Sequence, residues 1–301
     1  MTQSPPRSFP QSGTIGWIGT GIMGSSIVLH LLKAGYTVNV FNRTKSKTDD
    51  LIRAGAVWRS SPFDIAANSD AVFLMVGYPH DVRETVLGEN GVLNGIRPGG
   101  LIVDMTTSSP SLAVEIETAC RRKNVVSLDV PVSGGDVGAK KGTLSLMIGG
   151  DEKTANDLMP LWKVFGQTIV YHGPAGSGQH AKMVNQTILA GNMIGLCEGL
   201  LYARRAGLDW EKVLSSVSTG AAGSWTLSNM GPRILQGDFA PGFMTEHFLK
   251  DLRIVLDESK RMNIRLRGAE LAEQFYAEAV EQGCAADGSQ RLYTILERYS
   301  P

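Results

Sequence analysis

The fold is decided by the stretch Thr14-Ile-Gly-Trp-Ile-Gly19-Thr-Gly21-Ile-Met-Gly24-Ser-Ser26, in which a β-rich apolar run leads directly into the pattern G-x-G-x-x-G. This pattern predicts a dinucleotide-binding turn when it follows a strand and opens a helix. Gly19 permits the tight turn, Gly21 lets the backbone approach a pyrophosphate, and Gly24 lets the helix pack on the strand. The helix that opens with Ile22 and Met23 then directs free amides and a partial positive charge at the phosphates.

Outward from this turn, short β-rich runs alternate with helical stretches as far as about Tyr171. One helical stretch, Pro110–Arg122, has a strong start, with Ser109 as N-cap and proline at the first helical position. The alternation predicts an α/β fold, a Rossmann-type, doubly wound and mostly parallel sheet that is covered on both faces. The expected strands are Thr14–Ile18, Thr37–Phe41, Ala71–Val76, Leu101–Val103, Val125–Val130 and Leu144–Ile148.

The character of the sequence changes near Gly173, as expected of a chain whose 301 residues exceed one average domain. A long helical stretch runs from Gln179 to Arg205 and ends at Gly207, and no convincing strand follows it. We therefore expect a loose tail over residues 1–13, a dinucleotide-binding domain over 14–173 and an all-helical domain, entered through the long helix, over 174–301.

Bulk composition excludes several classes of protein. The 29 Lys and Arg residues balance the 29 Asp and Glu residues, so the basic footprint of a nucleic-acid binder is missing. The apolar run Thr187–Ala203 contains Asn192 and Glu198 and is shorter than the roughly 20 apolar residues of a membrane span. It is expected to be a buried core helix.

The three cysteines are scattered and odd in number, which argues against a disulfide framework and favours a reducing compartment. The first residues contain no apolar stretch that could act as a signal peptide. We expect the cytoplasm, with an organellar matrix left open.

The end of the second expected strand distinguishes the two nicotinamide cofactors. An NAD site usually has Asp or Glu about twenty residues after the glycines, to bond the ribose 2′-hydroxyl. This chain has Asn42-Arg43-Thr44 there. The guanidinium of Arg43 can donate two charge-assisted hydrogen bonds to a 2′-phosphate, and Asn42 and Thr44 add neutral hydrogen-bond donors. NADP is therefore the expected cofactor, with NAD weaker; the alternative is that Arg43 is a solvated loop residue.

The start of the long helix carries a candidate catalytic group. Lys182, Asn185 and Gln186 stand at i, i+3 and i+4, which places them on one face. Polar side chains on an otherwise apolar helix are costly to bury without a use. A lysine beside a nicotinamide can take the proton from an alcohol as hydride leaves, provided that its pKa falls below the roughly 10.4 of a free lysine. The spacing alone leaves a structural lysine open.

From about Thr14 to its end, the chain resembles the β-hydroxyacid dehydrogenases, in the branch called 3-hydroxyisobutyrate dehydrogenase-like. Besides the glycine turn, the resemblance rests on Met75-Val-Gly-Tyr-Pro-His-Asp-Val82, Asp104-Met-Thr-Thr-Ser-Ser-Pro110, Asp129-Val-Pro-Val-Ser-Gly-Gly-Asp-Val-Gly-Ala139, Gly142-Thr-Leu144, Gly149-Gly150, Gly176-Ser-Gly-Gln-His-Ala-Lys182-Met-Val-Asn-Gln186, Gly220-Ala-Ala-Gly-Ser-Trp225 and Lys250-Asp-Leu252.

The resemblance implies a role for individual positions. Lys182 matches the family's catalytic lysine, and Asn185 and Gln186 match the polar pair that orients substrate, although some members have Asn at the second position. Further roles are implied for the substrate-carboxylate loop Ser133, Gly134 and Gly135, for the cofactor contacts Val76, Thr107 and Lys250, and for Ser224 and Trp225 along the substrate cleft. Successive small residues in the loop also favour an anion cradle on physical grounds.

We therefore expect an oxidoreductase that moves a hydride between NADP and a small β-hydroxy acid of the 3-hydroxyisobutyrate type, or its semialdehyde, and that works as a homodimer or homotetramer. One alternative is a reductase of glyoxylate or succinic semialdehyde; imine reduction is disfavoured by the lysine. An alternative of another class is a non-catalytic NADP-binding sensor. No metal is expected, because the five histidines lack paired ligand spacing.

Overall fold

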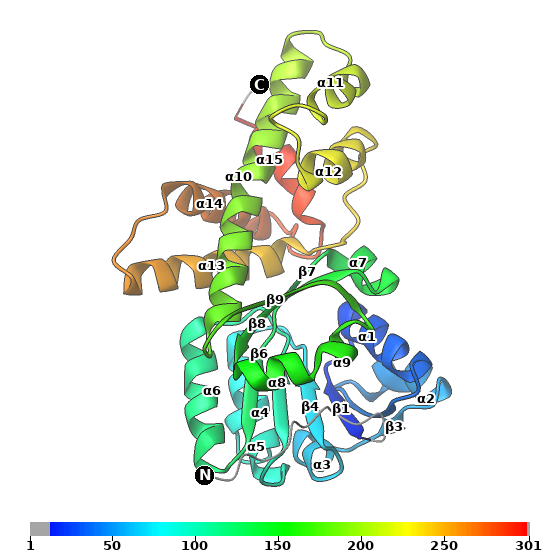
Figure 1. Ribbon diagram of the computed structural model, residues 1–301. Helices are drawn as coiled ribbons and strands as arrows, with labels where there is room; N and C mark the ends of the chain where they lie inside the picture. The colour runs from blue at the N-terminus through cyan, green and yellow to red at the C-terminus, as the bar shows by residue number, and fades with distance from the viewer. Residues whose placement is uncertain (1–12, 300–301) are drawn as a thin grey trace. The chain divides into compact units, whose positions relative to one another are not determined.

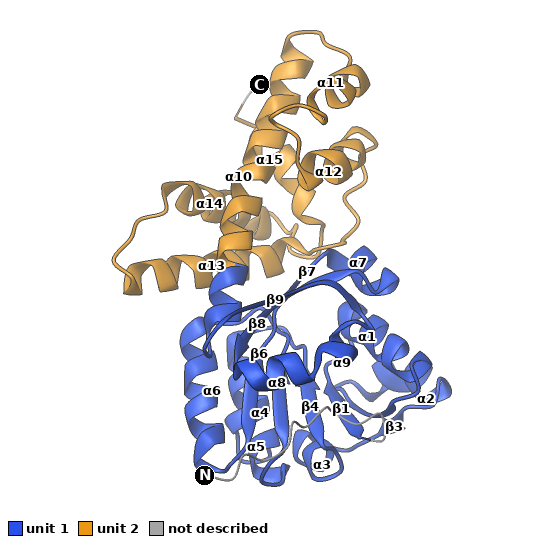
Figure 2. Ribbon diagram, viewed as in Figure 1, with its two compact units in different colours: residues 1–182 blue, residues 183–301 orange. Residues whose placement is uncertain are grey.

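The computed structural model describes residues 13–299, so the expected tail lies outside the described residues except for Gly13. Contacts divide the chain into two compact units, residues 1–182 and 183–301 (Figure 2). The division falls inside the long helix, later in the chain than the boundary expected at residue 173. The first turns of that helix therefore belong to the first unit.

The first unit is built on a mostly parallel sheet, as the alternating pattern predicts. Along the sheet the order is β3-β2-β1-β4-β5-β6-β8-β7, and β9 pairs with β8. Pairs from β3 to β6 are parallel, β8 runs antiparallel to β6 and β7, and β9 is parallel to β8. The strands are β1 (Thr14–Ile18), β2 (Thr37–Phe41), β3 (Val57–Trp58), β4 (Ala71–Leu74), β5 (Leu101–Asp104), β6 (Val126–Asp129), β7 (Val132–Ser133), β8 (Leu144–Gly150) and β9 (Gly166–Gly173).

Three of these strands, β3, β7 and β9, are not among the expected ones. The first two have only two residues each, too few for an alternating pattern to be recognised. β9 carries the short apolar run Ile169–Tyr171, but most of its residues are exposed or half-buried, so the buried core does not mark it as a strand. The six expected strands are confirmed, with ends that differ by a few residues.

Helices cover both faces of this sheet (Figure 1). The helix predicted to start at Pro110 is confirmed, because the Ser109 hydroxyl accepts a hydrogen bond from the Leu112 amide at 3.3 Å. The helices of this unit are α1 (Ile22–Lys33), the 3-10 turn η1 (Lys45–Thr48), α2 (Asp49–Arg53), α3 (Pro62–Ala67), α4 (Pro79–Leu87), α5 (Val92–Gly95), α6 (Pro110–Arg122), α7 (Gly135–Lys141), α8 (Glu152–Asp157), α9 (Met159–Trp162) and the start of α10 (Ser177–Arg205).

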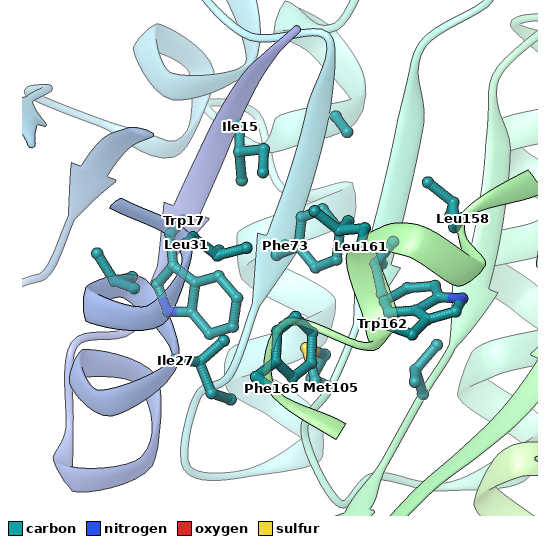
Figure 3. Packing of buried hydrophobic residues seen from close by; sticks show 14 of the residues in the cluster. Ile15, Trp17, Ile27, Leu31, Phe73, Met105, Leu158, Leu161, Trp162 and Phe165 are labelled. Atoms are coloured by element: carbon teal, nitrogen blue, oxygen red, sulfur yellow. The ribbon is translucent and has the colours of Figure 1, made fainter. Parts of the chain in front are cut away.

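Two apolar layers hold the helices on the sheet. On one face, Ile15 and Trp17 of β1 belong to a cluster with residues of α1, α2, α7, α8 and α9. Figure 3 shows both side chains in this cluster with Ile27 and Leu31 of α1 and with Trp162 of α9. Trp17 stacks on Phe73 with ring centroids 5.8 Å apart. On the other face, Ile18 packs with α3 to α6. This alternation along β1 fixes which side chains face each helical layer. Gly19 directly follows Ile18, so the glycine turn lies at the carboxyl end of the strand.

The second unit is all-helical apart from an isolated bridge between Met244 and Gly288. It contains the rest of α10, followed by α11 (Trp210–Val217), α12 (Trp225–Leu235), α13 (Thr245–Arg261), α14 (Arg267–Glu281), the 3-10 turn η2 (Ser289–Arg291) and α15 (Leu292–Glu297). Its core is formed by α10 residues such as Met193 and Cys197, packed with Phe248 and Tyr276. One face of the apolar run Thr187–Ala203 lies in this core, whereas Ile188 and Tyr202 on the other side of the helix are exposed, so the expectation of a fully buried helix holds for one face. Across residues 13–299 none of the helices combines the length and apolarity that crossing a membrane requires.

Candidate active site and cofactor site

Gly19, Gly21 and Gly24 of the turn differ in how much space each leaves for a side chain. Gly19 has φ +94, and a Cβ there would meet the Met75 carbonyl oxygen at 2.1 Å. A Cβ on Gly24 would meet the Gly19 carbonyl oxygen at the same distance. A Cβ on Gly21 would meet nothing within 4 Å. The protein itself therefore requires the first and third glycines, whereas the open space at Gly21 suits the close approach of a ligand.

The start of α1 lies beside this open space. Its N-cap is Gly21, which has no side chain to cap the helix, and Ile22 is 52% exposed. The amides of a first helical turn that lack a side-chain cap are ready to bind an anion. Gly21, Ile22 and Met23 are thus the residues that would hold a pyrophosphate at this helix start.

At the end of β2, Asn42 shapes the loop. Its side-chain oxygen accepts a hydrogen bond from the Thr20 amide at 3.2 Å, and its side-chain nitrogen donates to the Thr44 carbonyl at 3.0 Å. Asn42 therefore links the glycine turn to the segment after β2, beyond the donor role expected for it. Arg43 is 85% exposed, and its Nη1 lies 3.3 Å from Oδ1 of Asp81. The sequence interpretation did not include this acidic partner.

A hydrogen-bonded network joins the carboxyl ends of β4 and β5 to α10. The Val76 amide donates to the Thr106 hydroxyl at 3.0 Å. The Gln179 side chain donates to the Thr106 carbonyl at 2.7 Å and accepts from the Ser108 amide at 2.9 Å. Both backbone bonds flank Thr107, so the conformation of the segment around Thr107 is fixed by the first turn of α10.

Asp129, at the end of β6, fixes the start of α10 from the other side. Its two carboxylate oxygens accept hydrogen bonds from the amides of Gly176 and Gln179, both at 2.8 Å. Burial raises the pKa of Asp129 to about 6, and the amide hydrogen bonds oppose that rise. The carboxylate thus fixes the helix one turn before Lys182.

Lys182 is 7% exposed, and its Nζ donates a hydrogen bond to the Val132 carbonyl at 2.8 Å. Val132 is the first residue of β7 and directly precedes Ser133. The contact therefore brings the amine of α10 beside the loop Ser133–Gly135, over a separation of 50 residues in the sequence.

The loop itself has a backbone that favours glycine. Gly134 has φ +125 and Gly135 has φ +61, conformations that residues with a side chain rarely adopt. Gly134 is the N-cap of α7 and supplies no side-chain cap. Backbone amides in a glycine-rich turn of this kind are candidates for binding an anion such as a carboxylate.

In the second unit, four polar side chains form a chain of contacts. Asn185 donates to the Gln186 side-chain oxygen at 2.7 Å, and Gln186 donates to Oδ2 of Asp251 at 2.6 Å. Oδ1 of Asp251 lies 2.8 Å from Nζ of Lys250. Asp251 is 1% exposed. A buried carboxylate therefore orients Gln186, Lys250 and, through Gln186, Asn185.

His247 lies one turn before Lys250 on α13. Burial, and then the charge of Lys250, lower the pKa of His247. It is therefore held toward its neutral form beside the polar chain.

Ser224 and Trp225 begin α12. The Ser224 hydroxyl accepts from the Leu227 amide at 3.0 Å, which makes it the N-cap, and Trp225 is 58% exposed. Ser224 thus has a structural use that the sequence interpretation did not assign. Among residues 13–299, no cluster of three or more His, Cys, Asp or Glu side chains is arranged to hold a metal.

Three residues that organise the site, Asp81, Gln179 and Asp251, were not predicted from the sequence. Asp251 was within reach of sequence reasoning, because it follows Lys250 directly in an amphipathic helix. Asp81 and Gln179 gave no comparable signal, because their partners are 38 and 71 to 73 residues away.

Comparison with known proteins matches both units. Residues 14–173 match the model of the NAD binding domain of 6-phosphogluconate dehydrogenase. Residues 176–296 match the model described as NAD-binding of NADP-dependent 3-hydroxyisobutyrate dehydrogenase. The chain belongs to the β-hydroxyacid dehydrogenase family. It is an NAD(P)-dependent hydroxyacid dehydrogenase of the 3-hydroxyisobutyrate dehydrogenase-like branch.

Individual relatives agree. A probable mitochondrial 3-hydroxyisobutyrate dehydrogenase-like protein 1 of Arabidopsis thaliana is 52% identical over 290 residues, 96% of this chain and 86% of the relative. An NAD-dependent L-serine dehydrogenase of Pseudomonas aeruginosa is 34% identical over 291 residues, 94% of this chain and 96% of the relative. The structure of Mycobacterium tuberculosis 3-hydroxyisobutyrate dehydrogenase with L-serine has a TM-score of 0.86 at 28% identity, covering 95% of this chain and 99% of that chain.

Proposed function

We propose that this dehydrogenase prefers NADP and moves a hydride between the nicotinamide and the hydroxyl-bearing carbon of a small β-hydroxy acid of the 3-hydroxyisobutyrate type. The observation that carries the proposal is the contact between Lys182 and Val132. It brings a buried amine next to the Ser133–Gly135 loop, the anion cradle of the same unit.

Each group then has a defined task. The amides of Ser133–Gly135 hold the substrate carboxylate. When bound, the nicotinamide ring supplies the hydride acceptor. Lys182 takes the hydroxyl proton on its lone pair as the carbonyl forms, and in the reductive direction it returns that proton. A neutral lysine amine still has two N–H bonds besides its lone pair. It can therefore donate to the Val132 carbonyl while the lone pair accepts the substrate proton.

The polar chain of the second unit supports this chemistry. Asn185 and Gln186 orient the substrate, with Asp251 fixing both amides. We assign Lys250, Val76 and Thr107 to cofactor contacts, as the family resemblance implies, and Ser224 and Trp225 to the substrate cleft.

The preference for NADP rests on Arg43, an exposed guanidinium at the end of β2 with no acidic residue among Asn42, Arg43 and Thr44. The relative from Pseudomonas is named as NAD-dependent, so members of the family differ in cofactor. Arg43→Ala should weaken NADP binding about 10- to 150-fold, the equivalent of a charged hydrogen bond, and NAD binding little. Equal use of NAD and NADP by the wild-type enzyme would refute the preference.

The substrate is tested with a panel of short hydroxy acids and semialdehydes, assayed by nicotinamide absorbance in both directions. Fast turnover of a β-hydroxy acid supports the proposal. Turnover confined to glyoxylate or succinic semialdehyde with NADPH would instead favour the reductase alternative. Tight NADP binding without turnover of any panel member would favour a sensor.

We further propose that the protein assembles as a homodimer or homotetramer through its helical unit. Val184, Ile188 and Tyr202 of α10 are 61%, 59% and 75% exposed, an unusual exposure for large apolar side chains on one helix. Closed symmetric assembly is the common way to cover such residues. Sedimentation at micromolar concentration tests this, and a monomer would refute it.

A reducing compartment, the cytoplasm or an organellar matrix, is proposed because the cysteines of the described residues are free, with Cys120 and Cys197 buried. Burial raises the pKa of Cys120 to about 12, which keeps its thiol protonated. Fluorescent tagging of the chain in its own cells would test the compartment.

A further inference from the structure

The cofactor end of the first unit holds a carboxylate that the proposed function does not use. Asp81 lies in the first turn of α4, and its side chain is 14% exposed. Its Oδ1 lies 3.3 Å from Nη1 of Arg43 and 3.8 Å from Nε2 of His80. Arg43 is the residue assigned to the 2′-phosphate, so its present partner bears directly on cofactor choice.

Topology explains why these two residues meet. Arg43 follows β2 and Asp81 follows β4, and β1 lies between these strands in the sheet. The ion pair therefore spans the carboxyl end of the strand that leads into the Gly19 turn. In open sheets of this type, ligands bind outside the carboxyl ends of the strands.

The contact is a weak one by its geometry. A single nitrogen of Arg43 meets a single oxygen of Asp81 at 3.3 Å. By contrast, Arg83 and Glu115 form a two-point contact, with Nη2 2.6 Å from Oε2. A one-point contact to a side chain that is 85% exposed fixes the guanidinium poorly and can exchange it for another anion.

We propose that Asp81 is a specificity-determining residue that limits how strongly this site prefers a 2′-phosphate over a 2′-hydroxyl. To bind Arg43, a 2′-phosphate must break the ion pair between Arg43 and Asp81. The phosphate also places further negative charge near the Asp81 carboxylate, which repels it. A 2′-hydroxyl carries no charge, so its binding neither requires the ion pair to break nor is opposed by repulsion from Asp81. The inference rests on the proposed function, in which Arg43 faces the adenosine 2′-position.

The test is a direct binding measurement on the full chain. Adenosine 2′,5′-bisphosphate and 5′-AMP, which differ only by the 2′-phosphate, are titrated by calorimetry into wild type, Asp81→Asn and Asp157→Asn. Asp157 is a matched control, because its side chain is 19% exposed and pairs with Lys153 at 2.9 Å. Asp81→Asn should tighten the bisphosphate about 1.5- to 5-fold, the scale of an exposed ion pair, and leave AMP unchanged.

The preference for NADP and the role of Asp81 are tested by two different quantities. The wild-type ratio of AMP to bisphosphate dissociation constants tests the preference for NADP, and a ratio of one or below refutes that preference. The change of this ratio in Asp81→Asn tests the role of Asp81 whatever the wild-type value. An unchanged or smaller ratio would overturn the inference, since it would mean that Asp81 is neutral or holds Arg43 in place for the phosphate.

An Arg43→Ala background sharpens the result. Because Asp81 acts by withholding Arg43, Asp81→Asn should tighten the bisphosphate less there than in wild type. The gain in the wild-type background should also shrink as salt is raised, since exposed charges are screened. An equal gain with and without Arg43 would refute competition for the guanidinium.

Discussion

Nζ of Lys182 lies 2.8 Å from the carbonyl oxygen of Val132, the residue that directly precedes the Ser133–Gly135 loop. A helix and a two-residue strand, far apart in the sequence, thereby bring an amine beside the loop that we propose to hold the substrate carboxylate. The catalytic assignment depends on this contact, because a proton acceptor must lie within hydrogen-bonding reach of the hydroxyl that it serves.

Replacing Lys182 should remove turnover and spare cofactor binding. Lys182→Ala should lower kcat about 10²- to 10⁴-fold, the usual contribution of a positioned general base, with little change in NADP affinity. Lys182→Arg should fail almost as badly, because a guanidinium does not give up its proton at ordinary pH. Steady-state kinetics and NADPH fluorescence titration measure the two effects. Lys153→Ala, on the exposed side of α8, is the control. A Lys182→Ala variant whose main defect is lost NADP affinity would recast the residue as a cofactor ligand.

Two glycines of the same turn should respond differently to alanine. Gly24→Ala places a Cβ 2.1 Å from the Gly19 carbonyl, so it should cost about 1–3 kcal/mol of folding stability. Gly21→Ala meets no protein atom within 4 Å and should fold nearly normally, losing roughly 1 kcal/mol or less. If Gly21 faces the pyrophosphate, its methyl group should weaken cofactor binding about 5- to 150-fold. Urea denaturation and cofactor titration of both variants provide the measurements, and a Gly21→Ala variant with normal affinity would refute the cradle.

Asp251 should matter far more to stability than another acidic residue of the same helix. Asp251→Asn removes the charge that compensates Lys250 and weakens the bond that orients Gln186. Breaking a buried pair costs about 3–5 kcal/mol, and the residual exposure of Lys250 places the effect at the low end. Asp257→Asn is the control, because its pair with Lys260 is exposed, and it should change stability by less than about 1 kcal/mol. Equal unfolding midpoints in urea for the two variants would contradict this role.

Asp129 makes stability depend on pH. Its pKa is raised by burial from 3.8 to about 6 in the folded chain, so the folded state binds this proton more tightly than the unfolded state. Its contribution to the free energy of unfolding is therefore fully present below pH 3.8 and is lost as pH rises through about 6. The loss amounts to about 3 kcal/mol. Asp129→Asn cannot titrate, so the wild-type advantage over this variant should shrink across that window in denaturant unfolding. A constant difference would show that the carboxyl has an ordinary pKa.

Asp129→Asn should also affect catalysis through α10. An amide side chain has a single acceptor atom, so it cannot accept from both the Gly176 and Gln179 amides with separate oxygens as Asp129 does. The first turn of α10 should loosen, and kcat should fall while the dissociation constant of NADP changes little. Stopped-flow measurement of the hydride step checks this, and an unaltered rate would show that Lys182 is positioned without Asp129.

Much of the fold could be predicted because its signals are local. The run Thr14–Ile18 before the glycine turn, and Ser109 before Pro110, are patterns of a few neighbouring residues, and the elements that they predict are present. The strands β3, β7 and β9 escaped prediction because short or edge strands depend on a neighbouring strand for their hydrogen bonds. β3 pairs with β2, and β7 and β9 both pair with β8, where Ser145 registers with Ser133 on one side and Thr168 on the other.

The sequence by itself determined that this chain has a dinucleotide-binding turn, a long helix carrying Lys182, Asn185 and Gln186, and the motif set of a family. These properties follow from backbone preferences and from spacings within one element. Only the tertiary structure decided that Lys182 meets Val132, that Asp129 and Gln179 fix the start of α10, and that Arg43 is paired with Asp81. Such contacts depend on which strands lie side by side and on how deeply each charge is buried. Burial and strand order arise from the packing of the whole unit, so spacing along the chain does not encode them.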